Sequence, residues 1–186
     1  PSILFLFFES ESNIKTNVKY AGRNYLQLIS QPRFIQSITA SAFGYAIMTF
    51  LMTATPISMH VMENMSLNKT SIVIQFHVAA MFLPSLLTGH LIKRFGHSNV
   101  IYAGVFLYSI TLITSIFDQS FFNYMFALIF LGLGWNFLFI SGTSLLVLTY
   151  REEEKYRAQG LNDFVVYSIH AIGSLSAGVF IALTNW

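Results

Sequence analysis

Residues 121–150 read FFNYMFALIFLGLGWNFLFISGTSLLVLTY, and none of these side chains is Asp, Glu, Lys or Arg. A helix rises about 1.5 Å per residue, so about 20 residues cross a hydrocarbon core of about 30 Å. Inside lipid every backbone N–H must find a partner within its own segment, and for an open chain only a helix provides that. The stretch therefore predicts a transmembrane helix.

Four other segments share this near absence of charge, because the 10 basic and 8 acidic residues of the chain gather before and between them. These segments cover residues 34–59, 71–92, 99–117 and 161–183. Five such segments in a row disfavour the alternative of buried helices in a large soluble protein. The expected fold class is all-α, a polytopic membrane helical bundle. Pro56 and Pro84 lie inside the first two spans, where each removes a backbone donor and predicts a kink.

Composition excludes several other classes. Apolar residues make up 54% of the chain and charged residues 10%, against about 25% charged in soluble domains. The absence of cysteine excludes disulfides, thiolate nucleophiles and cysteine metal sites. A net charge of +2 does not suggest nucleic-acid binding, and 19 Phe residues argue against disorder. No two histidines are spaced i, i+4 on a span, so we expect no metal and no cofactor.

The chain begins with eight mostly apolar residues, too few for a span. We interpret residues 1–8 as the tail of a preceding transmembrane helix, residues 9–33 as a cytoplasmic connecting loop and residues 34–186 as a five-helix bundle. The lysines and arginines support this span count, because alternation places nine of them on one side and only Lys69 on the other. By the positive-inside rule the basic side is cytoplasmic. The nine are Lys15, Lys19, Arg23, Arg33, Lys93, Arg94, Arg151, Lys155 and Arg157.

Polar groups within the spans are informative because burying one without a partner is costly. His77 lies in the second span, Asn136 near the middle of the fourth and His170 near the middle of the fifth. Each histidine is either a structural hydrogen-bonding group or part of a cavity wall that titrates protons. Asn136 is either a solute contact or an interhelical bond. The small residues of the fifth span predict that it packs against other helices.

A short loop after the second span reads Gly-His-Leu-Ile-Lys-Arg-Phe-Gly-His over residues 89–97. Gly89 should permit close packing, and Gly96 should permit a turn with positive φ. The loop resembles the signature Gly-x-Leu-Ala-Asp-Arg-x-Gly-Arg-Arg of the major facilitator superfamily of secondary transporters, found between the second and third helices of each six-helix half. Gly89, Leu91, Arg94 and Gly96 match, whereas Lys93 stands at the position of the family's Asp.

A second loop covers residues 150–160 and reads Tyr-Arg-Glu-Glu-Glu-Lys-Tyr-Arg-Ala-Gln-Gly. It resembles the family's Glu-Arg-x-Arg-Ala-x-Gly loop between the fourth and fifth helices of a half. Together the loops imply that the chain is part of a major-facilitator-type six-helix half. The resemblance would make it an incomplete C-terminal half, covering helices seven to eleven of twelve. A further helix and an N-terminal half would then be its missing partners.

The resemblance implies a secondary active transporter that moves a small-molecule solute by alternating access, not an enzyme. It places this transporter in a cell membrane, with a bacterial inner membrane favoured. Protons are a candidate coupling ion, and His170 is the only titratable group at mid-membrane depth.

Two sets of candidate residues follow from the resemblance. Depth and polarity select the substrate-binding candidates, which are Asn136, Trp135, Thr53, Tyr45 and His170. The two loops supply the cytoplasmic gate candidates, which are Gly89, Lys93, Arg94, Gly96, Arg157, Gly160 and Asp163. Asp163 opens the fifth predicted span, so it is either a cap favoured by the helix dipole or half of a gating ion pair, with Arg157 or with a basic group of the other half.

Two alternatives differ in class. One is a membrane receptor or scaffold built on the same fold without transport. The more remote one is an intramembrane serine protease that uses Ser141 and His170, since such enzymes place these residues on separate spans.

Overall fold

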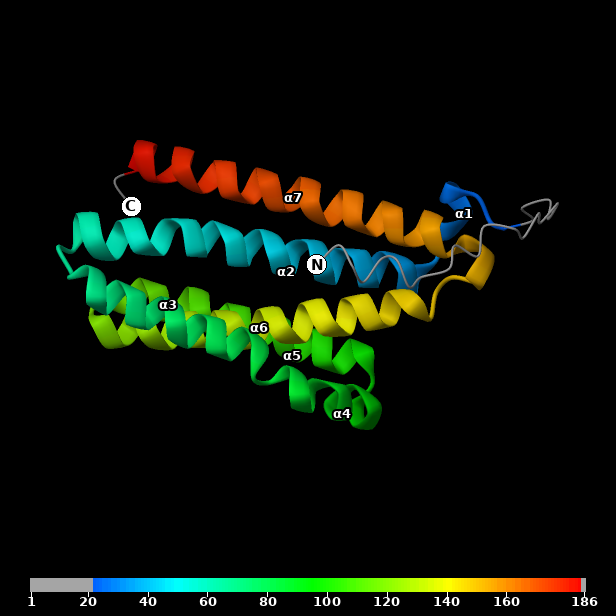
Figure 1. Cartoon of the computed structure of the whole chain (residues 1–186), viewed down its shortest axis with the longest axis horizontal. Coiled ribbons are helices and arrows are strands. Elements are labelled where there is room, and N and C mark those ends of the chain that lie inside the picture. Colours follow the sequence, from blue (N-terminus) through cyan, green and yellow to red (C-terminus); the bar gives the residue numbers. More distant parts are fainter. Residues whose placement is uncertain (1–21, 185–186) are drawn as a thin grey trace, which may run out of the picture.

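The computed structural model describes residues 22–184, and every regular element among them is a helix (Figure 1). The expected helix tail over residues 1–8 lies outside the described residues, as does the connecting loop up to residue 21. The rest of that loop contains a short helix, α1 (Tyr25–Ile29), which Asn24 caps by accepting a hydrogen bond from the backbone N–H of Gln27.

The long helices follow the apolar segments closely. They are α2 (Pro32–Ile57), α3 (Leu67–Phe82), α4 (Ser85–Phe95), α5 (His97–Phe117), α6 (Phe121–Val147) and α7 (Lys155–Thr184). α2 begins with proline, which needs no hydrogen-bond partner there, and it continues past Pro56 into a π-helical turn, Ser58–Met62. The side chains of Ser66 and Ser120 cap α3 and α6 by accepting backbone hydrogen bonds from Lys69 and Asn123.

The second predicted span is two helices and not one. α3 ends at Phe82, α4 starts at Ser85, and the two axes differ by 41° at this break. Pro84 explains the interruption because it has no N–H to donate to the preceding turn. Four described helices are long and apolar enough to cross a membrane, and the bent pair makes a fifth if it crosses as one span.

α7 starts six residues before the predicted span, after a 3-10 turn at Glu152–Glu154. Asp163 is therefore in the third turn of the helix and not at its N-terminus, so the capping interpretation is wrong. Residues 155–160 belong to the charged loop that was left out of the predicted span because it is polar. In the structure they form the first turns of α7.

The core of the bundle forms around α6, which packs against α5, α2 and α3 (Figure 1). α7 lies along the outside of α2, with Gly173 so close that an added Cβ would sit 2.9 Å from the carbonyl oxygen of Ala46. The packing predicted for the small residues of this span is therefore found on one face only, because Gly178 meets no atom within 4 Å in the described structure.

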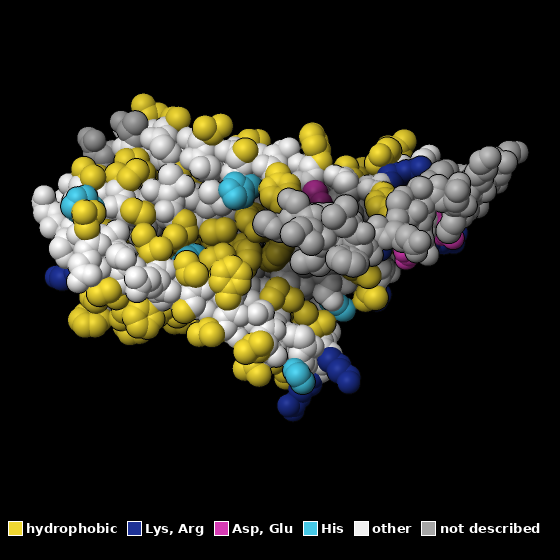
Figure 2. Space-filling model, in the orientation of Figure 1, with side chains coloured by type: hydrophobic (Ala, Val, Ile, Leu, Met, Phe, Trp, Pro, Cys, Tyr) yellow, Lys and Arg dark blue, Asp and Glu magenta, His cyan; other side chains and the backbone are white. Residues whose placement is uncertain are grey.

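The surface is largely apolar along the length of the helices (Figure 2). Large side chains such as Phe106 on α5, Phe122 on α6 and Leu175 on α7 are more than 60% exposed. Dark-blue basic side chains appear mainly at the end where α1 and the tip of α4 lie (Figures 1 and 2). An apolar belt bounded by basic residues at one end is the surface of a multi-pass membrane protein.

Candidate functional site

Five rings from four helices meet near the middle of the bundle. We call Tyr45 of α2, Phe82 of α3, Trp135 and Phe139 of α6, and His170 of α7 the ring cluster. The Tyr45 ring lies 5.3 Å edge-on from Trp135 and 5.0 Å edge-on from Phe139, and it stacks on His170 at 5.3 Å. Trp135 stacks on Phe139 at 5.0 Å and meets Phe82 edge-on at 6.2 Å. Such geometries are favourable for aromatic pairs.

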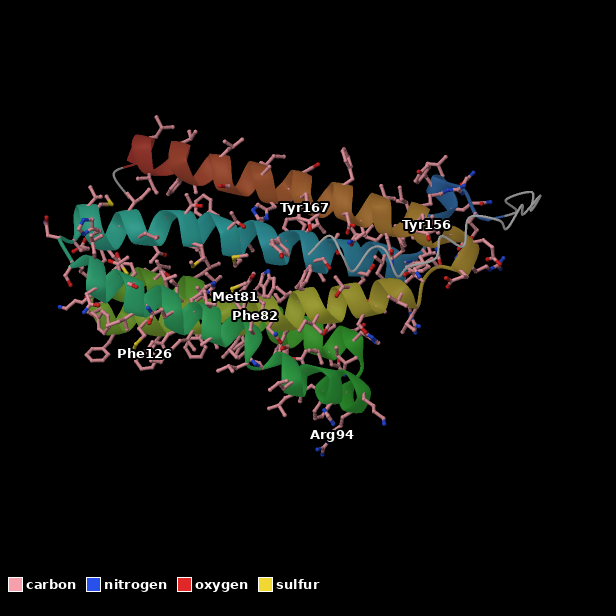
Figure 3. All side chains as sticks on the ribbon, viewed as in Figure 1. Met81, Phe82, Arg94, Phe126, Tyr156 and Tyr167 are labelled. Atoms are coloured by element: carbon pink, nitrogen blue, oxygen red, sulfur yellow. The ribbon has the colours of Figure 1, made fainter. Side chains whose placement is uncertain are left out.

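The helix periodicity explains how the cluster forms. Trp135 and Phe139 are four residues apart, so both lie on one face of α6. Tyr45, Trp135 and His170 each lie near the middle of a long helix, which puts the cluster near mid-membrane depth. Met81 and Phe82 are labelled at the end of α3, in the middle of the bundle (Figure 3).

Two buried nitrogens of the cluster have no hydrogen-bond partner among the described residues. They are Nε1 of Trp135 and Nδ1 of His170. A buried nitrogen without a partner is costly, so each is a group that a polar solute atom could satisfy. The cluster therefore combines aromatic rings with two unpaired polar nitrogens, groups that a flat ring with polar atoms on its edge could contact.

Three of the five predicted binding residues therefore come together, namely Tyr45, Trp135 and His170. Phe82 and Phe139 were missed because the selection was for polar side chains. For Phe139 the sequence did offer a signal, because its spacing of four residues from Trp135 places both rings on one face of a helix. Thr53 lies eight residues beyond Tyr45 on α2, or about 12 Å along the axis, and is not part of the cluster.

Asn136 lies next to Trp135 in sequence but faces another way. It is fully buried, its Nδ2 donates to the carbonyl oxygen of Met81 at 2.7 Å, and its Oδ1 accepts from the hydroxyl of Thr88 at 2.5 Å. The structure thus gives Asn136 an interhelical bond on each side of the α3–α4 break. His77 is similarly bonded, with Nδ1 2.8 Å from the carbonyl oxygen of Leu128.

The gate candidates fall into two groups at one end of the bundle. In the first group, Gly96 has a φ of 83°, as predicted for the loop, but Gly89 meets no atom within 4 Å and does not pack closely. Lys93 lies in the last turn of α4 together with Arg94, which is labelled at the tip of that helix (Figure 3). Neither forms an ion pair with another described residue.

The second group lies at the start of α7. Arg157 donates a hydrogen bond to the carbonyl oxygen of Arg23, and its guanidinium lies 5.5 Å from the Tyr25 ring centre. Gly160 has open space around it. Asp163 is exposed, accepts a hydrogen bond from Asn162 at 3.0 Å and does not pair with Arg157 in the described structure.

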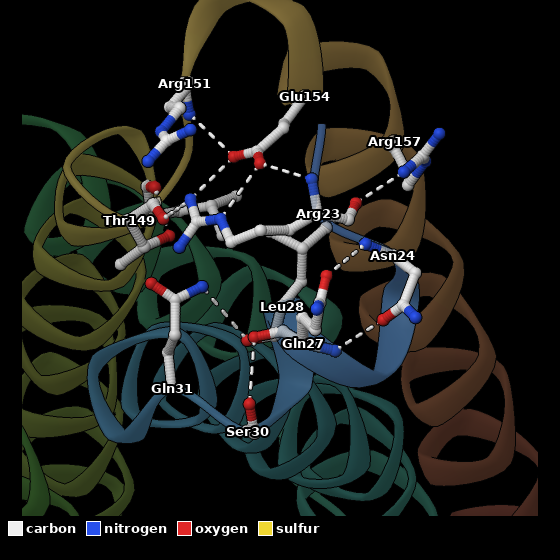
Figure 4. A network of polar contacts seen from close by, with 11 residues as sticks. Arg23, Asn24, Gln27, Leu28, Ser30, Gln31, Thr149, Arg151, Glu154 and Arg157 are labelled. Carbon is white, nitrogen blue, oxygen red and sulfur yellow. Dashed lines mark hydrogen bonds and ion pairs between the residues drawn. The ribbon is translucent and has the colours of Figure 1, made fainter. Parts of the chain in front are cut away.

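A buried ion pair that the sequence did not reveal fixes this end of the molecule (Figure 4). The carboxylate of Glu154 is 1% exposed and accepts from Nε of Arg23 at 2.9 Å and from its Nη2 at 2.6 Å. The backbone N–H groups of Arg23 and Arg151 also donate to this carboxylate, at 2.7 and 2.9 Å. The hydrogen bond to Glu154 raises the pKa of Arg23 above its ordinary value.

A groove of about 740 Å³ separates α2 from α5 and does not include any residue of the ring cluster. Its wall is mostly apolar but also contains polar side chains, among them Thr39, Ser109 and the pair Gln36 and Ser98, which form a hydrogen bond of 3.0 Å. No group of three His, Cys, Asp or Glu residues suited to a metal ion occurs between residues 22 and 184.

Long apolar helices and basic loops at one end define a polytopic membrane protein, with the ring cluster near the middle of its helices. The chain belongs to the Major Facilitator Superfamily, whose family model matches residues 2–186. Ser141 Oγ and His170 Nδ1 both lack a hydrogen-bond partner among the described residues, so the structure does not join these two side chains.

Several curated relatives are similar to the chain. The riboflavin transporter RfnT of Brucella anthropi is 39% identical over 165 residues, which cover 89% of this chain and 41% of that protein. Two uncharacterised transporters of the same family from Bacillus subtilis, YddS and YdeG, are each 34% identical, over 75% and 82% of this chain and 32% and 36% of their own lengths. The chain thus spans less than half the length of these relatives. No solved structure gives a significant match.

Proposed function

We propose that this chain forms helices seven to eleven in the C-terminal half of a secondary transporter that carries riboflavin, or a closely similar flat aromatic solute, by alternating access. The N-terminal half is its partner, and the membrane is the bacterial cytoplasmic membrane, as the bacterial origin of the relatives suggests. In this mechanism two helix bundles rock about a solute site near the membrane midplane.

The ring cluster is the observation that carries the proposal. Riboflavin contains a flat three-ring system with hydrogen-bonding atoms along its edge. The faces of Tyr45 and Trp135 could receive such a ring system, since aromatic pairs contribute about 0.5–1.5 kcal/mol each beyond the area they bury. Nδ1 of His170 and Nε1 of Trp135 could bind its polar edge. The similarity to RfnT independently suggests the same solute.

The test is uptake of riboflavin by the full-length transporter in cells that lack other riboflavin carriers. We expect His170→Ala to raise the KM for riboflavin about tenfold, because one stacking face and one hydrogen bond contribute roughly 1–3 kcal/mol together. Trp135→Phe, which keeps a ring but removes the indole N–H, should raise KM by a smaller factor. Transporter abundance in the membrane is measured beside uptake.

The matched control is His60→Ala, because His60 is an exposed histidine at the outer end of the first span. It should transport riboflavin as the unmodified protein does. An unchanged KM in both ring-cluster variants would refute a solute site at the cluster. Binding of riboflavin without any uptake would instead favour the receptor alternative.

Asp163 remains a proposed gate residue, because it is exposed at the cytoplasmic end without an ion-pair partner among the described residues. Its partner in this proposal is a basic group of the N-terminal half. We expect Asp163→Asn in the full-length protein to slow transport severalfold and to leave membrane abundance intact, since an exposed side chain contributes little to folding. Unchanged transport would exclude the gating role.

A further inference from the structure

The break between α3 and α4 leaves a turn in which the regular helix ladder is replaced. The N–H of Leu83 still donates to the carbonyl oxygen of Ala79 at 2.9 Å, and those of Leu87 and Thr88 donate to Pro84 at 2.8 and 2.9 Å. Pro84 itself has no N–H to donate. The N–H of Leu86 donates to the carbonyl oxygen of Leu83 at 3.4 Å, and the hydroxyls of Ser85 and Thr88 donate to the carbonyl oxygens of Phe82 and Pro84. Side-chain hydroxyls thus take over part of the backbone ladder at this break, as expected of a hinge.

Asn136 of α6 fastens both sides of this hinge. Its Nδ2 donates to Met81, one residue before the end of α3, and its Oδ1 accepts from Thr88 in the first turn of α4. All three residues are buried. One amide side chain of a neighbouring helix thus sets the angle at which α4 leaves α3.

The helix beyond the hinge is held by little else. Within the part of the chain that the structure describes, Thr88 is the one residue of α4 that is buried, and Leu86 and Leu87 are 79% and 66% exposed. At its far end α4 joins α5 through Gly96 alone. A helix with few packing contacts and one strong polar anchor can change its angle at small cost.

The hinge also touches the ring cluster. Phe82, the last residue of α3, meets the ring of Trp135 edge-on at 6.2 Å, and Trp135 directly precedes Asn136 on α6. A solute that moves the Trp135 ring therefore acts on the segment of α6 that carries Asn136. A solute that moves the Phe82 ring acts on the last residue of α3, directly before the break.

We propose that Asn136 is a positioning residue that couples occupancy of the ring cluster to the angle of α4, and through α4 to the cytoplasmic loop at Lys93 and Arg94. This inference rests on the proposed function, because it requires a solute at the cluster. The protein with an empty ring cluster favours one α4 angle, and the protein with an occupied cluster favours another. Riboflavin therefore shifts the population toward the conformation that it binds more tightly, by as much as its affinities for the two conformations differ. Asn136 makes each angle well defined by pairing Met81 and Thr88.

The first experiment measures the α4 angle directly. Spin labels are attached to Leu87→Cys on α4 and Leu148→Cys at the end of α6, both exposed positions, in a cysteine-free full-length transporter in lipid nanodiscs. Without riboflavin, Asn136→Ala and Thr88→Val should broaden the distance distribution between the labels. Thr88→Ser, which keeps the hydroxyl, should not. A distribution unchanged by Asn136→Ala and by Thr88→Val would overturn the hinge, whether or not riboflavin binds.

The second experiment adds riboflavin and follows its fluorescence quenching as a measure of binding. In the unmodified protein we expect binding to shift the mean distance between the labels. In Asn136→Ala we expect binding within about twofold of normal, loss of the shift, and a turnover number reduced about tenfold. The matched control is Asn123→Ala on the same helix, where the amide donates to Thr114 and Asp118 far from the break.

The outcomes separate the two proposals. No riboflavin binding in the unmodified protein overturns the proposed function. Normal binding with a shift that persists in Asn136→Ala overturns the coupling and leaves the proposed function in place. A turnover number that falls equally in Asn123→Ala and Asn136→Ala also overturns the coupling, because the loss of an α6 amide away from the break would then have the same effect.

Discussion

Glu154→Ala is expected to lower the free energy of unfolding by about 3 kcal/mol, because it removes one partner of a buried ion pair. The Glu154 carboxylate is the acceptor for two nitrogens of the Arg23 side chain and for two backbone N–H groups. All four donors lose this acceptor in the variant. Since the Arg23 side chain is 28% exposed, water recovers part of the loss, and the expected effect lies at the lower end of the range for buried ion pairs.

Thermal unfolding of the purified protein in detergent measures this effect. The matched control is Glu152→Ala in the same turn, because the Glu152 side chain is 85% exposed and lies 3.5 Å from Lys155 in a surface ion pair. Surface pairs of this kind contribute little to stability. Equal losses in the two variants would show that the Glu154 network does not hold the α6–α7 turn to α1.

Gly132→Val is expected to destabilise the protein by about 3 kcal/mol, the upper end of the cost of overpacking a core. A Cβ at this position would lie 2.7 Å from the carbonyl oxygen of His77 and 3.1 Å from the backbone nitrogen of Met81. These are backbone atoms of α3, so the two helices must separate to make room. Separation of α3 and α6 also lengthens the hydrogen bond from Asn136 to the carbonyl oxygen of Met81, because this bond joins the same two helices.

Folded yield and thermal unfolding of Gly132→Val are compared with those of Gly178→Val on α7. Gly178 meets no atom within 4 Å, so its replacement introduces no clash in the described structure. Glycine is also a poor helix former, by about 1 kcal/mol relative to alanine, which further favours the control. A Gly132 variant as stable as the Gly178 variant would mean that α3 and α6 do not approach as closely as the structure shows.

The sequence was sufficient for the helical class and for most helix positions. The helix over residues 121–147 was predicted from its uncharged stretch, and the φ of Gly96 from the loop pattern. The start of α7 was predicted wrongly, because charge was used to mark the end of a span and a helix can continue beyond lipid. The break at Pro84 was predicted as a kink, but its 41° angle and the hydrogen bonds from Asn136 that span it were not.

The candidate site was predicted in part. Tyr45, Trp135 and His170 were selected by depth, and the structure brings them together because the faces of α2, α6 and α7 happen to converge at that level. Depth says nothing about which way a side chain points. Asn136 was selected by the same reasoning as Trp135, yet one residue along a helix turns it about 100° toward α3 and α4.

By itself the amino-acid sequence determined that this chain is a multi-pass helical membrane protein, because hydrogen bonding of the backbone in lipid and the sidedness of basic residues can be read along the chain. Its two loop motifs resembled the Major Facilitator Superfamily, to which it belongs. Only the tertiary structure decided which polar groups meet. Arg23 and Glu154 are 131 residues apart, and Asn136 is 48 residues from Thr88. Such pairs depend on how each helix is rotated about its axis, and that rotation is set by the packing of all its neighbours at once.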